Sequence, residues 1–89
     1  MLEQHRFRQF ERDTKLQGKR GKDPDKLKTI IRCLIEEKPL PERNKDHVLS
    51  GTYAGYRECH VEPDWLLIYK REGDVIYFVR TGTHADLFD

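Results

Sequence analysis

Cysteine is scarce in this chain of 89 residues, which contains only two. Cys33 and Cys59 lie far apart and form no Cys-x-x-Cys pair, so the sequence indicates neither a disulfide framework nor a redox motif. No apolar run is long enough to cross a bilayer, and no stretch has the pattern of a signal peptide. These absences favour a reduced, cytoplasmic protein in which each cysteine is a small core residue.

The chain also lacks internal repeats, low-complexity segments and the length for a second domain. We therefore expect one domain over residues 1–89, with a compact core, because small chains bury a modest share of their surface. A hydrophobic content of 36%, with one Trp, four Tyr and four Phe, can build such a core without a disulfide.

The whole chain has no large excess of one charge, since its formal net charge is +1, but its halves differ. Residues 1–45 contain 13 Lys or Arg against 8 Asp or Glu, whereas residues 46–89 contain 4 against 8. The positive charge is concentrated over two predicted helices and their connector, at Lys15, Lys19, Arg20, Lys22, Lys26 and Lys28. If these side chains share a face, they can hold a phosphate backbone. The alternative is a solvated helix surface, which is common in proteins that never bind nucleic acid.

Two strands around a turn are predicted at residues 56–69, and the rest of the chain is organised around them. Residues 56–61 alternate between two faces, as in a half-buried strand. One face carries Arg57, Cys59 and Val61, and the other carries Tyr56, Glu58 and His60. Pro63 and Asp64 form the turn, and the continuous apolar run from Trp65 to Tyr69 predicts a central strand. An imidazole, carboxylates and an indole thus crowd one end of a rigid strand pair.

Two helices are predicted before this strand pair. Residues 8–20 favour a mostly exposed helix that ends near Gly18 and Gly21. Asp23 and Pro24 are typical of the N-cap and first turn of a stronger helix. Its apolar stripe, which must cover a sheet, consists of Leu27, Ile30, Ile31, Leu34 and Ile35. Pro39 and Pro41 are expected to end this helix.

The remaining segments complete an α+β domain. Residues 2–7 are compatible with a short edge strand, residues 39–46 with a polar connector, and residues 47–55 with a glycine-containing loop. After a hairpin at residues 70–74, residues 75–80 form a third strand, and Thr83 can cap a terminal turn. We expect two N-terminal helices packed on one face of a twisted, mainly antiparallel sheet, with function on the other face, which is open at one end.

Several segments resemble the YafQ branch of the RelE/ParE toxin superfamily, and together they span nearly the whole chain. The segments are Lys45-Asp46-His47, Leu49-Ser50-Gly51, Gly55-Tyr56-Arg57, His60-Val61-Glu62-Pro63-Asp64-Trp65, Leu67-Ile68-Tyr69-Lys70, Arg80-Thr81-Gly82-Thr83-His84 and Leu87-Phe88. The resemblance implies a RelE-like fold and a bacterial type II toxin that acts as a ribosome-dependent mRNA interferase. It also implies a cognate antitoxin of the DinJ or RelB kind, a toxin–antitoxin complex that binds its own operator DNA, no cofactor and no membrane association.

Metal-free RNA cleavage needs a base for the 2′-hydroxyl proton, an acid for the leaving 5′-oxygen and a cation for the phosphate. Histidine suits both proton roles. The residues at the family positions, predicted to form the catalytic set, are His47, His60, Asp64 and His84. We expect His84 to be the general acid and His60 or His47 the base, with Asp64 either orienting an imidazole or serving as the base itself.

Four further residues are candidates for binding RNA. Arg57 and Arg80 can neutralise the scissile phosphate, although a structural ion pair is the alternative for Arg57. Trp65 and Phe88 can stack on unpaired bases. Core packing is the alternative for Trp65.

Two other functional classes remain open. The catalytic set has residue types that suit zinc, although the chain lacks the local ligand spacing of a structural zinc site. A toxin of the ParE branch would share the fold but act by binding DNA gyrase, and it would not require clustered histidines. The histidines at the family positions argue against that class.

Overall fold

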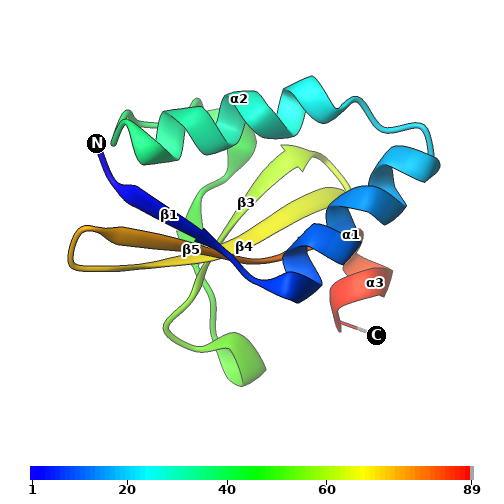
Figure 1. Cartoon of the computed structure of the whole chain (residues 1–89). Helices are drawn as coiled ribbons and strands as arrows, with labels where there is room; N and C mark the ends of the chain where they lie inside the picture. Colours follow the sequence, from blue (N-terminus) through cyan, green and yellow to red (C-terminus); the bar gives the residue numbers. More distant parts are fainter. Residues whose placement is uncertain (89) are drawn as a thin grey trace.

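The computed structural model describes residues 1–88 and is built on a single five-stranded sheet (Figure 1). The strand order is β1-β5-β4-β3-β2. The strands are β1 (Glu3–Arg6), β2 (His47–Val48), β3 (Arg57–Glu62), β4 (Trp65–Glu72) and β5 (Val75–Gly82). β1 is parallel to β5, and every other pair is antiparallel. The predicted central meander is confirmed, and the N-terminal segment is an edge strand.

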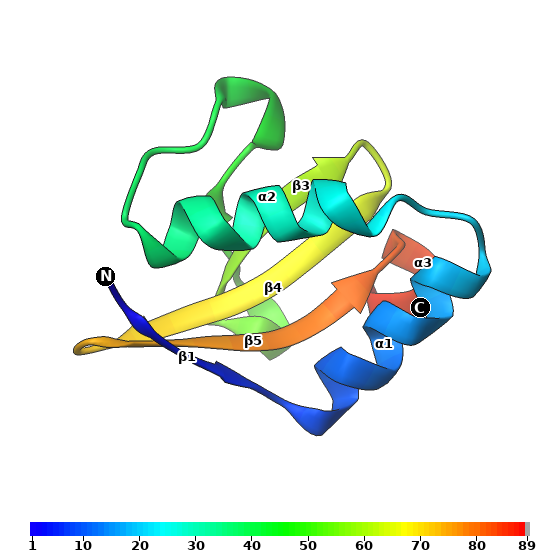
Figure 2. The same cartoon turned by 45° about the horizontal axis from the view of Figure 1, so that its top comes forward.

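Two helices, α1 (Arg8–Lys19) and α2 (Pro24–Ile35), pack on one face of the sheet. Figure 2 shows α2 lying across this face and α1 beside the end of β5. α2 begins where predicted, because the Asp23 carboxylate accepts a hydrogen bond of 2.9 Å from the Asp25 backbone N–H. Its predicted stripe faces the sheet, with Leu27, Ile30 and Ile31 buried. The predicted α+β architecture, with two N-terminal helices on one face of a mainly antiparallel sheet, is therefore confirmed.

The second helix ends earlier than the proline positions indicated. α2 stops at Ile35, well before Pro39, because Glu37 adopts a left-handed conformation with φ of 59°. The Glu37 and Lys38 N–H groups then donate to the carbonyls of Leu34 and Cys33, which closes the helix end. A non-glycine residue in this conformation gives no signal in the sequence. α1, in contrast, ends at Lys19, between Gly18 and Gly21, as predicted.

The apolar residues form two separate clusters, one on each face of the sheet. The cluster beneath the helices contains Leu2, Phe10, Leu27, Ile30, Ile31, Cys59, Trp65, Leu67, Tyr69, Ile76 and Phe78. The cluster on the opposite face contains Leu66, Ile68, Val79 and Leu87, and Leu49, Tyr53, Tyr56 and Tyr77 pack against it. The sequence predicted a second face that is open at one end, but it did not predict what covers the rest of that face. Residues 49–56 and the short helix α3 (His84–Phe88) cover it.

A bulge changes which residues of β5 lie on which face. Ile68 of β4 is opposite Arg80, but the next residue, Tyr69, is opposite Phe78, so Val79 is an extra residue on β5. Residues directly opposite each other on neighbouring strands share a face. Arg80 therefore lies on the face of Ile68, although simple alternation from Phe78 would place it under the helices.

The segment predicted as a loop at residues 47–55 contains more order than expected. His47 and Val48 form β2 opposite Glu58 and Arg57, and residues 51–53 form a short 3-10 turn. A strand of two residues is too short for a periodic pattern to reveal it. A second 3-10 turn at residues 42–44 lies in the connector. No helix among residues 1–88 is long and apolar enough to cross a membrane.

Candidate active site

The three histidines predicted to converge lie side by side on the face opposite α1 and α2. His47 comes from β2, His60 from β3 and His84 from the first position of α3. The ring centroids of His47 and His60 are 6.3 Å apart, and those of His60 and His84 are 6.0 Å apart. We refer to His47, His60 and His84 as the histidine row. Three segments of the chain thus bring together three groups able to transfer protons.

Asp64, in the turn between β3 and β4, holds the outer end of the histidine row. Its Oδ1 atom lies 2.7 Å from Nδ1 of His84 and accepts a 2.9 Å hydrogen bond from the His84 backbone N–H. These bonds, first the backbone one and then the side-chain one, lower the pKa of the Asp64 carboxyl below its usual value. Because Asp64 is ionised and occupies Nδ1, Nε2 is the His84 nitrogen left for a substrate. This geometry suits an orienting group, and the role of Asp64 stays a prediction.

The backbone fixes the ring orientation of the other two histidines. Nδ1 of His60 lies 3.2 Å from the Pro63 carbonyl, and Nδ1 of His47 lies 2.5 Å from the Lys45 carbonyl. A carbonyl can only accept a hydrogen bond, so each Nδ1 carries a proton and each neutral ring has its lone pair on Nε2. For His60 this is the tautomer needed for a base whose Nε2 faces the substrate, whereas Nε2 of His47 lies 3.2 Å from the Glu58 carboxylate.

Glu58 completes the site and was not among the predicted site residues. It is 5% exposed, and its Oε2 atom lies 3.2 Å from Nε2 of His47 and 3.7 Å from Nε2 of His60. Its Oε1 atom is buried with no hydrogen-bond partner among residues 1–88. A buried carboxylate is costly unless a positive charge is close. Glu58 is thus placed to hold a protonated imidazole. The sequence feature that could have identified it is its position two residues before His60, on the same face of β3.

Phe88 extends the row and remains accessible. Its ring centroid is 6.2 Å from that of His84 and 5.8 Å from that of Tyr53, and it is 44% exposed. An exposed ring beside proton-transfer groups suits stacking on an unpaired base. Tyr53 is a second aromatic residue of this surface that the sequence did not single out.

Trp65, in contrast, cannot stack on RNA, and that interpretation is wrong. The residue is 1% exposed, its Nε1 donates to the Thr81 hydroxyl at 2.9 Å, and the Lys22 ammonium lies 5.7 Å from its ring centroid. The core packing named as the alternative is what the structure shows. The physical reason is that both faces of the sheet are covered at β4. The ring of Trp65, the first residue of this strand, is therefore not accessible to RNA.

The two predicted phosphate-binding arginines are both engaged in ion pairs. Arg57 lies on the β3 face opposite His60 and pairs with Asp46 at 3.3 Å, so it points away from the histidine row. The structural alternative therefore holds for Arg57. Arg80 is bound through two bonds to Asp13 of α1, at 2.7 and 3.2 Å, and its side chain is 25% exposed. The bulge in β5 places Arg80 on the site face, where a role with phosphate stays a prediction.

The six basic residues predicted to contact a phosphate backbone do not share one face. Arg20 pairs with Asp86 and Lys26 pairs with Glu62, each at 2.7 Å. Lys26 faces the β3 side of α2, whereas Lys28 lines a groove beside β1, since residues two apart point to opposite sides of a helix. Lys22 lies over Trp65, which leaves Lys15 and Lys19 exposed on α1.

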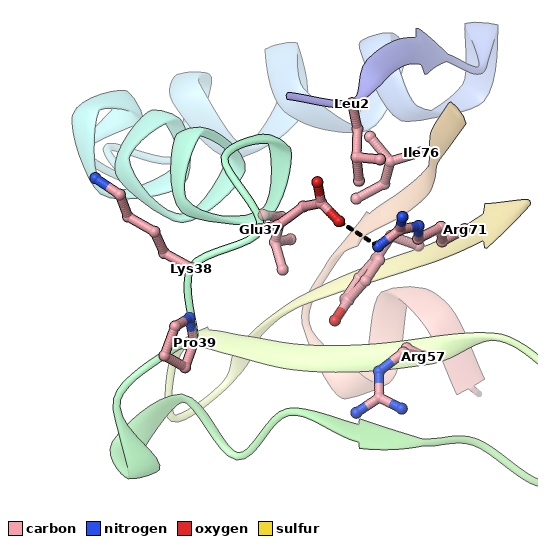
Figure 3. Close-up of a pocket in the computed structure, with 9 residues that line it drawn as sticks. Leu2, Glu37, Lys38, Pro39, Arg57, Arg71 and Ile76 are labelled. Atoms are coloured by element: carbon pink, nitrogen blue, oxygen red, sulfur yellow. Dashed lines mark hydrogen bonds and ion pairs between the residues drawn. The ribbon is translucent and has the colours of Figure 1, made fainter. Parts of the chain in front are cut away.

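A pocket of about 390 Å³ lies on the helix side of the sheet, away from the histidine row (Figure 3). Leu2, Leu34 and Ile76 give it apolar walls, and an ion pair of 2.6 Å between Glu37 and Arg71 crosses it. None of the catalytic set lines this pocket. Within residues 1–88, no group of three His, Cys, Asp or Glu side chains is placed to hold a metal ion.

Residues 2–89 match a protein family described as a bacterial toxin of type II toxin-antitoxin systems, YafQ. The chain belongs to the YafQ toxin family. The mRNA interferase toxin YafQ of Escherichia coli strain K12 is 53% identical over 81 residues, which cover 90% of this chain and 88% of that protein. The family resemblance drawn from the sequence is therefore confirmed.

Solved structures of YafQ share the whole fold of this toxin. A crystal structure of YafQ from E. coli BL21(DE3) is 47% identical and has a TM-score of 0.94, with 100% of both chains covered. A chain from a crystal structure of the E. coli DinJ–YafQ complex is 48% identical and has a TM-score of 0.92, again with 100% of both chains covered.

Proposed function

We propose that this toxin is an mRNA interferase that cleaves message on the ribosome by histidine acid–base chemistry without a metal. The observation that carries the proposal is the histidine row, with Asp64 bound to His84 at one end and Glu58 bound to His47 at the other. The curated relatives that carry the name mRNA interferase support the same activity.

The arrangement supports a complete transfer of protons during cleavage. His60, with its Nε2 lone pair, takes the proton of the 2′-hydroxyl, and the 2′-oxygen bonds to the adjacent phosphorus. His47 is the second candidate base, but its Nε2 faces the Glu58 carboxylate at 3.2 Å. The bond from phosphorus to the 5′-oxygen breaks, and His84 gives its Nε2 proton to that oxygen. The products are a 2′,3′-cyclic phosphate and a 5′-hydroxyl end. Glu58 stabilises the imidazolium that forms beside it by Coulomb attraction.

Aromatic and cationic side chains around the histidine row would bind the RNA. Phe88 and Tyr53 offer ring surfaces for bases. Arg80 is the cation on the site face, and a phosphate would compete with Asp13 for its guanidinium. Lys15 and Lys19 on α1 are the exposed cations that would approach ribosomal RNA.

The proposed partners follow from the family. A neighbouring solved structure is a DinJ–YafQ toxin–antitoxin complex, so we expect a cognate antitoxin of the DinJ or RelB kind to bind this toxin. Such a complex is expected to bind its own operator DNA. Acting on ribosomes would place the toxin in the bacterial cytoplasm. No observation on the site face favours the ParE-like alternative of gyrase inhibition.

The test uses toxin treated with EDTA and then dialysed, mixed with ribosomes translating a defined message in their own magnesium. We expect full cleavage, with sequenced fragments that begin with a 5′-hydroxyl and end in a 2′,3′-cyclic phosphate. Cleavage that is lost on chelation and restored by zinc would move the site to the metal class. Supercoiling by purified gyrase, measured in parallel, tests the gyrase alternative.

A further inference from the structure

The C-terminal helix α3 carries two side chains of the site, His84 and Phe88, on only five residues. A helix of this length does not form alone, because its hydrogen bonds do not offset the cost of the first turn. Its position therefore depends on contacts with the rest of the molecule. Leu87 is buried in the cluster on the site face, and Asp64 binds the first residue of the helix.

A third anchor of α3 is the carboxylate of Asp86. Its Oδ2 atom accepts hydrogen bonds from the Thr83 backbone N–H at 2.9 Å, from Nε2 of Gln17 at 3.0 Å and from Nη1 of Arg20 at 2.7 Å. The Thr83 hydroxyl accepts in return from the Asp86 N–H at 3.1 Å, which is a capping box. The bonds to Gln17 and Arg20 join α3 to α1. Figures 1 and 2 both show α3 beside the C-terminal half of α1.

Two features make this joint rigid. Gln17 is 1% exposed, so its side chain has no freedom to swing away from Asp86. Gly82 at the end of β5 leaves just enough room for the Asp86 side chain. A Cβ atom at position 82 would lie 2.9 Å from both Cβ and Oδ2 of Asp86. The Asp86 carboxylate also stays ionised, because the hydrogen bond from Arg20 and then that from the Thr83 N–H lower its pKa.

We propose that Asp86 is a positioning residue, which fixes α3 on α1 and thereby sets where His84 and Phe88 stand relative to His60. Asp86 lies two residues from each of them, and its carboxylate is bonded to Gln17 and Arg20. The inference rests on the proposed function, because it assigns His84 and Phe88 to the cleavage. It also gives Arg20 a role inside the toxin in place of the ribosome contact expected from the sequence.

The first measurement is single-turnover cleavage of ribosome-bound message by Asp86→Ala and Arg20→Ala toxins. A misplacement of about 1 Å can cost on the order of 100-fold in rate, so we expect a loss of about 10- to 100-fold in the rate constant. The toxin concentration that half-saturates ribosomes should not change. Asp86→Asn keeps an acceptor oxygen and should recover part of the rate. Glu37→Gln, which removes the 2.6 Å ion pair to Arg71 on the opposite face, is the matched control and should cleave normally.

The second measurement reports the position of α3 directly in the folded protein. The His84 N–H and ring hold the pKa of Asp64 low, so a displaced α3 should return it toward the ordinary value. Carbon-13 NMR titration of the Asp64 carboxyl can follow this in Asp86→Ala or, if that variant is unstable, in Asp86→Asn. A role in stability alone would leave the Asp64 pKa where it is.

The outcomes separate the two proposals. Wild-type cleavage and an unmoved Asp64 pKa in the Asp86 variants, alongside an inactive His84→Ala toxin, would overturn the positioning role alone. A fully active His84→Ala toxin would instead overturn the proposed function. Weakened ribosome binding by Arg20→Ala at an unchanged rate constant would return Arg20 to the ribosome-contacting set and would also overturn the positioning role.

Discussion

His84 and Asp64 form the part of the site where one residue depends most directly on another. Replacing His84 with Ala removes the proposed acid, and we expect cleavage of ribosome-bound message to fall by about 10²- to 10⁴-fold. The fold should be retained, because the His84 side chain is 56% exposed. Asp64→Asn should lower the rate as well, since the neutral amide no longer stabilises the protonated ring. Rate constants in a purified translation system, with circular dichroism for the fold, test both variants.

A matched control for these variants is His5→Ala. His5 lies on β1, where its ring contacts Phe7 and Tyr77 at centroid distances of 5.7 and 5.6 Å, and it is outside the histidine row. We expect this variant to cleave at the wild-type rate. Equal losses in His5→Ala and His84→Ala would mean that removing any histidine disturbs the fold, and the catalytic assignment would fail.

Asp86 links the site to stability in acid. Its pKa is lowered in the folded protein, chiefly by the hydrogen bond from Arg20, so its contribution to stability is complete above the ordinary carboxyl pKa of about 4. That contribution is lost as the pH falls through this value toward the folded pKa. We therefore expect the free energy of unfolding to drop between about pH 5 and pH 2, and to drop less in Asp86→Asn. Urea unfolding at several pH values measures this, and identical pH slopes would contradict it.

At the residue scale, the sequence predicted charge and chemistry better than burial. His47, His60, Asp64 and His84 were chosen because they stand at the family positions, and the structure brings them together on one face of the sheet. Trp65 was misassigned, although the unbroken apolar run that it begins already indicated a strand buried on both faces. Glu58 was missed because an acid in an alternating strand is usually solvated. Its burial depends on β2, which pairs with β3 and brings His47 opposite Glu58.

Among the elements, α2 is the one whose start is best defined by sequence. The Asp23 carboxylate caps its first turn, and N-cap substitutions to alanine typically cost about 1 kcal/mol. We expect Asp23→Ala to lower the free energy of unfolding by that amount, measured by urea denaturation, and Asp23→Asn to be close to wild type. The cleavage rate at saturating ribosome concentration should not change. A stability loss as large in the Asn variant would show that the charge, rather than the cap, is what matters.

The elements that could not be predicted are those set by tertiary contacts. The end of α2 depends on the left-handed Glu37, and the face of Arg80 depends on the extra residue Val79 in β5. Neither feature has a residue type that identifies it. β2 forms because its two residues pair with the edge of β3. A strand of two residues is too short to give a periodic pattern in the sequence.

At the scale of the whole molecule, one face of the sheet carries the main core and the other carries the candidate active site. The helix face holds the main core, and the pocket on this face is lined by none of the catalytic set. The opposite face carries the histidine row around a smaller core. The sequence predicted the helix-covered face from the apolar stripe of α2. It did not predict the second core, because that core draws single residues from several loops and from α3.

The charge asymmetry of the halves leads to a prediction for ribosome binding that the structure makes more specific. Arg20 and Lys26 are engaged in ion pairs, whereas Lys15 and Lys19 are exposed and form no salt bridge with residues 1–88. Each phosphate contact contributes about 0.7 to 0.9 to the slope of log affinity against log salt. Replacing Lys15 and Lys19 together with Gln should therefore weaken ribosome association at low salt and reduce that slope by about 1.5. Lys28→Gln, beside β1 on the far side of α2, is the control that should keep the wild-type slope. Ribosome pelleting across a salt series measures both, and an unchanged slope in the double variant would show that α1 presents only a solvated surface.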